Sequence, residues 1–135
     1  THFDICWYDT YKIGIEDIDG EHKQLFEQLS DVYAVKKENG FTKQYTEKLE
    51  GYIKSLKQHL RHEETLMSEY EYSRVSVQQN AHAVVFEMIA AFNKKKKHTI
   101  DEQNQFLEEL KEWLLYHTLI EDRKYSQFFH EHGVR

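Results

Sequence analysis

The chain has 135 residues, a formal net charge of −6 and a single cysteine, Cys6. This length suits one domain with its own core, and no stretch resembles a signal peptide or a membrane-spanning run. An acidic chain lacks the basic face that nucleic acid requires, and a lone cysteine forms no internal disulfide. We therefore expect a single domain, residues 1–135, in a reducing cytoplasm, without nucleic acid or membrane as partners.

The composition predicts an all-α fold. There is no proline and there are only five glycines, so few positions interrupt a helix, and strong helix formers such as Leu, Glu, Lys and Gln are abundant. An irregular N-terminal arm containing Trp7 and Tyr11 comes first. Four helical stretches with short connections follow, which favours an antiparallel up-down-up-down four-helix bundle.

The first two helices are read from their apolar repeats. Asp19 is the expected cap of the first, whose inward positions begin at His22, and Gly40 is expected to end it. Thr42 is expected to open the second helix, in which inward positions recur every three or four residues. Its inward stripe runs over residues 45–67 and includes both His59 and Glu63.

The last two helices follow a break in the pattern around residues 71–76. Ser73 or Ser76 is the expected cap of the third helix, which closes in the lysine run 94–97, where cations favour the carbonyl end of a helix. Asp101 is the expected cap of the fourth helix, and its apolar stripe leads to an inward histidine. The inward polar residues of these two helices are Gln78, His82 and His117, with Asp122 just beyond.

Six side chains able to bind a metal therefore occupy inward positions on four helices. Imidazole nitrogen and carboxylate oxygen suit iron, and one carboxylate can bridge two ions. A single inward histidine is more often a hydrogen-bonded core residue, but burying this whole set without a cation is strongly unfavourable. The set predicts a two-iron site formed by His22, His59, Glu63, His82, His117 and Asp122.

Two pairs in this set differ in their spacing along the helix. His59 and Glu63 are one turn apart and share a face, whereas His117 and Asp122 are five apart, about 140° around an ideal helix. The fourth helix must therefore bend, end or bulge between them. The other histidines lie off the inward stripes or near chain and helix ends and are expected to be solvated: His2, His62, His98, His130 and His132.

These segments resemble the hemerythrin family, in particular its bacterial single-domain and sensor-fused members. The similar segments are IGIEDIDGEHKQLF, HLRHEETLM, residues 72–86 and WLLYHTLIEDRKY, in the family's order and spacing. The resemblance implies a bundle holding two iron ions, joined by an oxo or hydroxo group, that binds O2. It implies that Glu63 and Asp122 bridge the ions, that His22 and His59 serve the O2-binding iron, and that His82 and His117 serve the other.

One ligand position departs from the family pattern. Four residues before His82 the family would have a histidine, and this chain has Gln78. An amide oxygen is a weaker ligand than imidazole, so Gln78 binds weakly through oxygen, water fills the position, or an exogenous ligand binds there. Of these three we expect a vacant or water-filled position. Four residues near the ligands are expected to line the O2 pocket: Leu25, Trp113, Leu114 and Thr118.

An open second iron favours a sensing function. Water or small anions at that iron would stabilise the di-ferric state, so we expect rapid autoxidation and an O2 or redox sensor read by a fused or partner signalling domain. The alternatives are an O2 carrier or store and a di-iron peroxidase, oxidase or nitric-oxide handler. Against an enzyme, the Glu-x-x-His pairs of ferritin-like oxidases are missing. A metal-free helical adaptor would leave the buried charges uncompensated.

Overall fold

The computed structural model describes residues 5–135, and within them the fold is helical without any strand. This confirms the all-α prediction for the described residues. No helix in this part of the chain combines the length and apolarity that crossing a bilayer demands. The long helices are α1 (Glu16–Asn39), α2 (Lys43–Glu69), α3 (Val75–Lys94) and α4 (Ile100–Tyr116); the shorter elements are the 3-10 turn η1 (Asp9–Tyr11), the π-helical turn η2 (His117–Glu121) and α5 (Arg123–Glu131).

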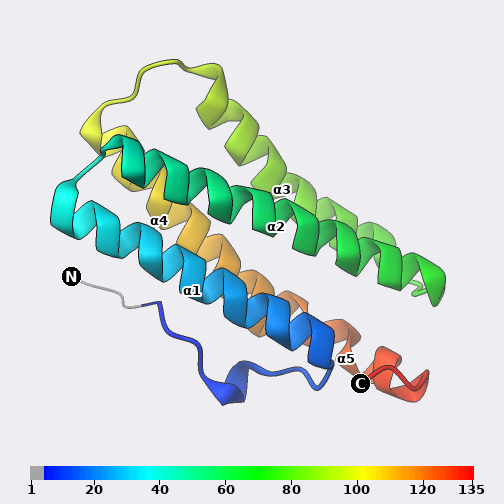
Figure 1. The fold of residues 1–135 in the computed structure, drawn as a ribbon. Coiled ribbons are helices and arrows are strands. Elements are labelled where there is room, and N and C mark those ends of the chain that lie inside the picture. Colours follow the sequence, from blue (N-terminus) through cyan, green and yellow to red (C-terminus); the bar gives the residue numbers. More distant parts are fainter. Residues whose placement is uncertain (1–4) are drawn as a thin grey trace.

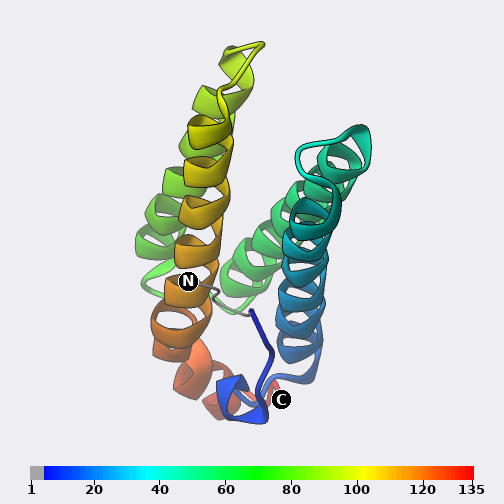
Figure 2. The same ribbon diagram turned by 90° about the vertical axis from the view of Figure 1, so that its left-hand side faces the viewer.

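The four long helices form two pairs. α1 and α2 lie side by side along their length, joined by the turn at Gly40, and α3 and α4 form the other pair (Figure 1). Figure 2 shows the two pairs on opposite sides of the molecule, with η1 and α5 gathered at the same end. The α2–α3 connection also lies at this end, whereas the α1–α2 and α3–α4 connections lie at the far end.

The interior contains two apolar clusters with polar side chains between them. The larger cluster includes Leu25 of α1 and Leu60 of α2, and the smaller includes Ile18 of α1 and Met67 of α2. Each such side chain contributes about 1.5–3 kcal/mol when fully buried. The inward polar positions of the helices fall between the two clusters, so the fold places a polar layer across the bundle near the α5 end.

Two of the predicted helix caps are confirmed. Gly40 ends α1 with a φ of 73°, a left-handed conformation that favours glycine, and its N–H donates to the Lys36 carbonyl. The Thr42 side chain accepts a hydrogen bond from the Tyr45 N–H at the start of α2. The predicted end of the third helix is also confirmed, since α3 closes at Lys94 in the lysine run.

The other predicted caps are wrong. Asp19 lies inside the first turn of α1, and its carboxylate accepts hydrogen bonds from the backbone N–H groups of Ile13 and Gly14, 2.8 and 3.1 Å away. It fixes the incoming arm instead of capping the helix. α3 follows Arg74 without a side-chain cap, so neither Ser73 nor Ser76 has that role.

The cap of α4 is also not the predicted one. Thr99 takes the place expected for Asp101, because the Thr99 hydroxyl accepts from the Glu102 N–H while the Glu102 carboxylate accepts from the Thr99 N–H. This reciprocal capping box satisfies two backbone donors at once. Asp101 is the second residue of α4, where its carboxylate lies near the positive end of the helix dipole.

Candidate metal centre

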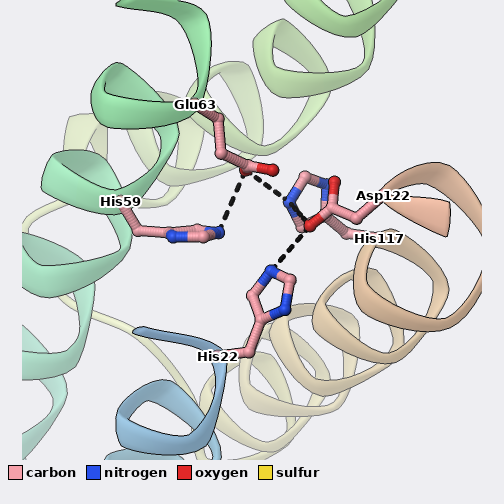
Figure 3. A group of neighbouring side chains, drawn as sticks. All are labelled: His22, His59, Glu63, His117 and Asp122. Atoms are coloured by element: carbon pink, nitrogen blue, oxygen red, sulfur yellow. Dashed lines mark hydrogen bonds and ion pairs between the residues drawn. The ribbon is translucent and has the colours of Figure 1, made fainter. Parts of the chain in front are cut away.

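Five of the six predicted metal-binding side chains converge in the polar layer. Figure 3 shows them pointing toward one another from α1, α2 and the segment that begins with η2 and ends at Asp122. One nitrogen or oxygen from each lies within 4.8 Å of the others, and all five residues are buried. They are His22, His59, Glu63, His117 and Asp122.

The two carboxylates lie between the imidazoles. Asp122 Oδ2 is 2.6 Å from His22 Nε2 and 3.0 Å from His117 Nε2. Glu63 Oε1 is 2.9 Å from His117 Nε2 and 3.0 Å from His59 Nε2. One oxygen of each carboxylate therefore faces two rings that come from different elements.

The π-helical turn η2 brings His117 and Asp122 to the same side. The Asp122 N–H donates to the His117 carbonyl, 2.9 Å away, across five residues instead of four. The wider turn takes up the extra residue that would otherwise rotate Asp122 away from the site. The irregularity required by the five-residue spacing is therefore a π-turn, a feature that often occurs at functional sites.

His82 and Gln78 of α3 lie beside the five converging residues. His82 Nε2 is 3.7 Å from Glu63 Oε1, further than the other imidazoles. Gln78 is buried, its Nε2 donates to the Glu121 carbonyl at 3.2 Å, and its Oε1 has no hydrogen-bond partner among the described residues. The third predicted segment is thus close to the centre, with the amide held by its nitrogen.

Three buried or half-buried contacts around the centre were not predicted. Glu21 Oε1 is 2.7 Å from His59 Nδ1, and Glu64 Oε2 is 3.0 Å from His82 Nδ1. The Tyr125 hydroxyl donates to the second oxygen of Glu63. Contacts on Nδ1 leave Nε2 directed at the centre, as in most metal-binding histidines. Glu21 and Glu64 adjoin ligand residues in sequence, but they lie off the inward stripe, so spacing alone did not identify them.

The buried polar atoms support a cation at this place. Among the described residues, Nε2 of His22, His59 and His82 and both Asp122 carboxylate oxygens make no hydrogen bond. Two of these nitrogens lie within 3.0 Å of a carboxylate oxygen, yet without hydrogen-bond angles. Buried polar atoms are rarely left unpaired, and converging nitrogen and oxygen donors are completed by a metal ion.

The charges of the metal-free site point the same way. Burial alone would lower the pKa of His59, but Glu63, Glu21 and Asp122 raise it to about 9. Burial alone would also lower the pKa of His117, but Asp122 and Glu63 raise it to about 10. Burial would raise the pKa of Glu63, but His59 and His117 hold it well below its usual range. Without a cation, the protons on the imidazoles balance the negative charge of the carboxylates, and a bound metal ion would replace those protons.

The remaining described histidines are half-buried or exposed, in line with the expected solvation, and each also makes a hydrogen bond. His62 Nδ1 lies 2.7 Å from Glu21 Oε2. His2 lies outside the described residues. A ring nitrogen lies within 2.9 Å of a backbone carbonyl oxygen in each of His98, His130 and His132.

Of the four residues expected to line an O2 pocket, three are buried and the fourth stacks on a histidine of the centre. Leu25, Leu114 and Thr118 are buried, and the Thr118 hydroxyl has no hydrogen-bond partner in the described part of the chain. Trp113 stacks on His117 with ring centroids 4.5 Å apart, and it also approaches His82 at 6.4 Å. Trp113 therefore contacts the histidine pair that the resemblance assigns to the second iron.

The sequence comparisons agree with this geometry. Residues 13–129 match the family model of the hemerythrin HHE cation-binding domain. The chain belongs to the hemerythrin family. It is 28% identical over 128 residues to the bacteriohemerythrin of Clostridium acetobutylicum, covering 88% of this chain and 96% of that protein. It is 28% identical over 120 residues to the myohemerythrin of Theromyzon tessulatum, covering 89% of each. No solved structure gives a significant match.

Membership in this family identifies the cofactor. The hemerythrin domain holds a di-iron centre that binds O2, and the imidazole and carboxylate cluster of this chain has the donor chemistry to hold it. The sequence has seven polar residues at the inward positions of the site. Five converge, His82 adjoins them, and Gln78 is the one whose chemistry departs from the pattern.

Proposed function

We propose that this chain is a di-iron O2 or redox sensor domain that passes readily to the di-ferric state. The observation that carries the proposal is Gln78. Its Nε2 is tied to the Glu121 carbonyl at 3.2 Å, and its buried Oε1 has no partner among the described residues. An amide therefore occupies the position where the family resemblance expects an imidazole, and only its weakly ligating oxygen remains for a cation.

The proposed scaffold is an antiparallel up-down-up-down four-helix bundle with an irregular N-terminal arm. The proposed ligands fall into two imidazole pairs, one for each iron. The rings of His22 and His59 have centroids 4.7 Å apart, and those of His82 and His117 are 5.2 Å apart. The remaining two ligands are Glu63 and Asp122, and the support for a bridging role is that each faces more than one imidazole.

When bound, the two irons supply the electrons that O2 takes up. The side chains around the irons control whether water and small anions can reach them. Leu25, Leu114 and Thr118 are proposed to keep the O2 pocket dry, because they are buried and lie within one turn of ligand residues. Trp113 is proposed to complete the apolar wall from the side of His117, on which it stacks. Gln78 leaves the second iron with one strong ligand fewer, so water or a small anion has room to bind the oxidised state and stabilise it.

This asymmetry favours sensing over storage. A store needs a long-lived oxy form, whereas a sensor needs a state that changes with O2 or redox poise. Family members are O2 binders, and we propose no enzymatic reaction for this chain. The change in iron oxidation state would shift the ligands and the helices that carry them, and a fused or partner signalling domain in the cytoplasm would read it.

The test compares the wild-type chain with Gln78→His. Each protein is reduced without air, its iron is counted, and its visible charge-transfer spectrum is followed after O2 is added. We expect two irons per chain in both, fast passage of the wild type to a stable di-ferric spectrum, and autoxidation at least several-fold slower in Gln78→His. A matched control is Gln79→His on the exposed face of α3, which should oxidise like the wild type.

Two results would contradict the proposal. A wild-type oxy spectrum that persists in air and reverses under vacuum would indicate an O2 carrier. Equal autoxidation rates in the wild type and Gln78→His would mean that the amide does not expose the second iron.

A further inference from the structure

The carboxylate of Glu21 joins two imidazoles of α2. Its Oε1 is 2.7 Å from His59 Nδ1, and its Oε2 is 2.7 Å from His62 Nδ1. The His59 side chain is 1% exposed, whereas those of Glu21 and His62 are 31% and 38% exposed. One carboxylate of α1 thus connects a buried histidine of the metal centre to a histidine at the protein surface.

Helix geometry explains why one carboxylate reaches both rings. His59 and His62 are three residues apart, so their side chains are neighbours on the surface of α2. α1 packs alongside α2, which brings Glu21 opposite the gap between them.

A carboxylate on Nδ1 fixes the state of the histidine that it holds. In the neutral imidazole that binds a metal, a hydrogen bond from Nδ1–H of His59 to Glu21 leaves the lone pair on Nε2, the nitrogen that faces Glu63 at 3.0 Å. The glutamate side chain is long and flexible, so one contact restrains it only partly. The second contact, from His62, holds the other oxygen and with it the plane of the carboxylate.

The other proposed ligands lack this double restraint. Nδ1 of His22 and Nδ1 of His117 have no hydrogen-bond partner among the described residues. His82 Nδ1 contacts Glu64 at the longer distance of 3.0 Å. Among the four imidazoles, His59 is therefore the one whose Nδ1 is held by a carboxylate that a second histidine also contacts.

We propose that Glu21 and His62 form a positioning pair for His59. His62 holds the carboxylate, and the carboxylate sets the tautomer and ring orientation of His59 toward the metal. Neither residue binds the metal itself. This inference rests on the proposed function only in that His59 is taken as a metal ligand, and it does not depend on whether the domain senses or stores O2.

The test uses Co²⁺ and Zn²⁺ as probes, so iron oxidation does not enter. Co²⁺ titrations followed by visible absorption are made on the wild type, Glu21→Ala, His62→Ala and His62→Asn. We expect Glu21→Ala to weaken Co²⁺ binding about 10–100-fold and to change the Co²⁺ spectrum. His62→Ala should weaken binding less, by under about tenfold. His62→Asn should recover most of the loss, because the asparagine amide nitrogen can take the place of Nδ1.

Nitrogen-15 NMR of the zinc-loaded proteins reports the tautomer directly. In the wild type we expect His59 to carry its proton on Nδ1 with a strongly downfield shift, and Glu21→Ala should lose that signal. The matched control is Arg61→Ala, an exposed neighbour on α2, which should behave like the wild type in both measurements. Circular dichroism of the metal-free variants checks that each is folded.

The outcomes separate this inference from the sensor proposal. Unchanged Co²⁺ affinity and an unchanged His59 signal in Glu21→Ala would overturn the positioning pair. Wild-type behaviour of His62→Ala in both measurements would remove His62 from it. A long-lived, reversible oxy complex of the iron protein would overturn the sensor proposal and leave these metal-binding results standing.

Discussion

The two ends of the bundle are built differently. At the far end, Gly40 and Thr42 end one helix and begin the next, and the Thr99–Glu102 capping box begins α4. At the metal end, α3 begins without a side-chain cap, Glu71 has a φ of 56°, and η2 interrupts the α-helical pattern. Unpaired buried polar atoms occur at both ends, among them the Tyr45 hydroxyl and Asn104 Oδ1 at the far end, but most of them belong to the ligand residues of the metal end.

This difference separates stability from function within one fold. Departures from local rules gather where a site needs a particular geometry, and the rest of the molecule stabilises them. The far end should therefore be stable without metal, and the metal end should depend on it. Variants at each end can test that division.

The largest effect is expected from loss of a carboxylate between the imidazoles. Asp122→Ala removes the group that faces both His22 and His117, so we expect fewer than two irons per chain and at least about 10²-fold weaker metal binding. Glu63→Ala should act alike. Iron analysis after anaerobic loading measures this, and Thr42→Ala at the far end serves as the control. Two tightly bound irons in Asp122→Ala would contradict the bridging assignment.

Metal removal should affect one end more than the other. A metal at 1,000 times its Kd stabilises a folded protein by about 4 kcal/mol, roughly 10–15 °C in Tm for a chain of this size. Melting curves with and without chelator measure the shift. Limited trypsin digestion locates it: cleavage near Arg123 and Lys124 should accelerate on chelation, whereas cleavage in the lysine run 94–97 should not. Equal acceleration at both places would refute a division between the ends.

The pH dependence should also differ between the ends. The raised pKa values of His59 and His117, about 9 and about 10, mean that both are protonated at pH 7 without metal. Their contribution to metal-free stability is complete below about pH 6.5 and is lost as pH rises through 9 and 10. Metal binding must displace these protons, so apparent affinity should rise with pH, by up to about 100-fold per unit if both leave.

Co²⁺ titrations at three pH values between 6.5 and 8.5 measure this slope, and a pH-independent affinity would contradict it.

At the far end, stability depends on pH in the opposite sense. The hydrogen bond from Lys95 and the contacts with Thr99 lower the pKa of Glu102 to about 2. Its stabilising contribution is present above about pH 4.5 and is lost as pH falls toward 2.

The smallest effect is expected at the far-end cap. Thr99→Ala removes the hydroxyl that accepts from the Glu102 N–H, which should cost about 1 kcal/mol of unfolding free energy. Chemical denaturation measures it, with Thr65→Ala on the exposed face of α2 as the control. Iron content should be unchanged, and a loss of iron in Thr99→Ala would show that the two ends are coupled.

The sequence predicted the features that are set by residue spacing within a single helix. The repeat in α2 identified its inward face, and the one-turn spacing of His59 and Glu63 placed both in the core, where the structure has them. The five-residue step from His117 to Asp122 required an irregular turn, although spacing did not specify a π-turn. Asp19 and Asp101 were mistaken for caps because a carboxylate near a helix start has several possible roles: one holds the incoming backbone, and the other lies inside a helix capped by Thr99.

Contacts between helices could not be predicted in this way. Glu21 is next to His22 and so points about 100° away from it on an ideal helix. Its approach to His59 and His62 depends on how α1 packs on α2, and no single-helix repeat encodes that packing. The same holds for Tyr125, which reaches Glu63 from α5.

One face of α5 fastens the segment before α1. Side chains of Arg123, Ser126 and His130 donate to the backbone carbonyls of Thr10, Ile13 and Gly14, at 2.6, 2.7 and 2.9 Å. Gly14 has a φ of 82°, and a Cβ there would lie 2.8 Å from the His130 ring, so any other residue would be strained and would displace that ring. Residues 10–14 and α5 thus form one cooperative unit, and amide hydrogen exchange should find their protection rising and falling together.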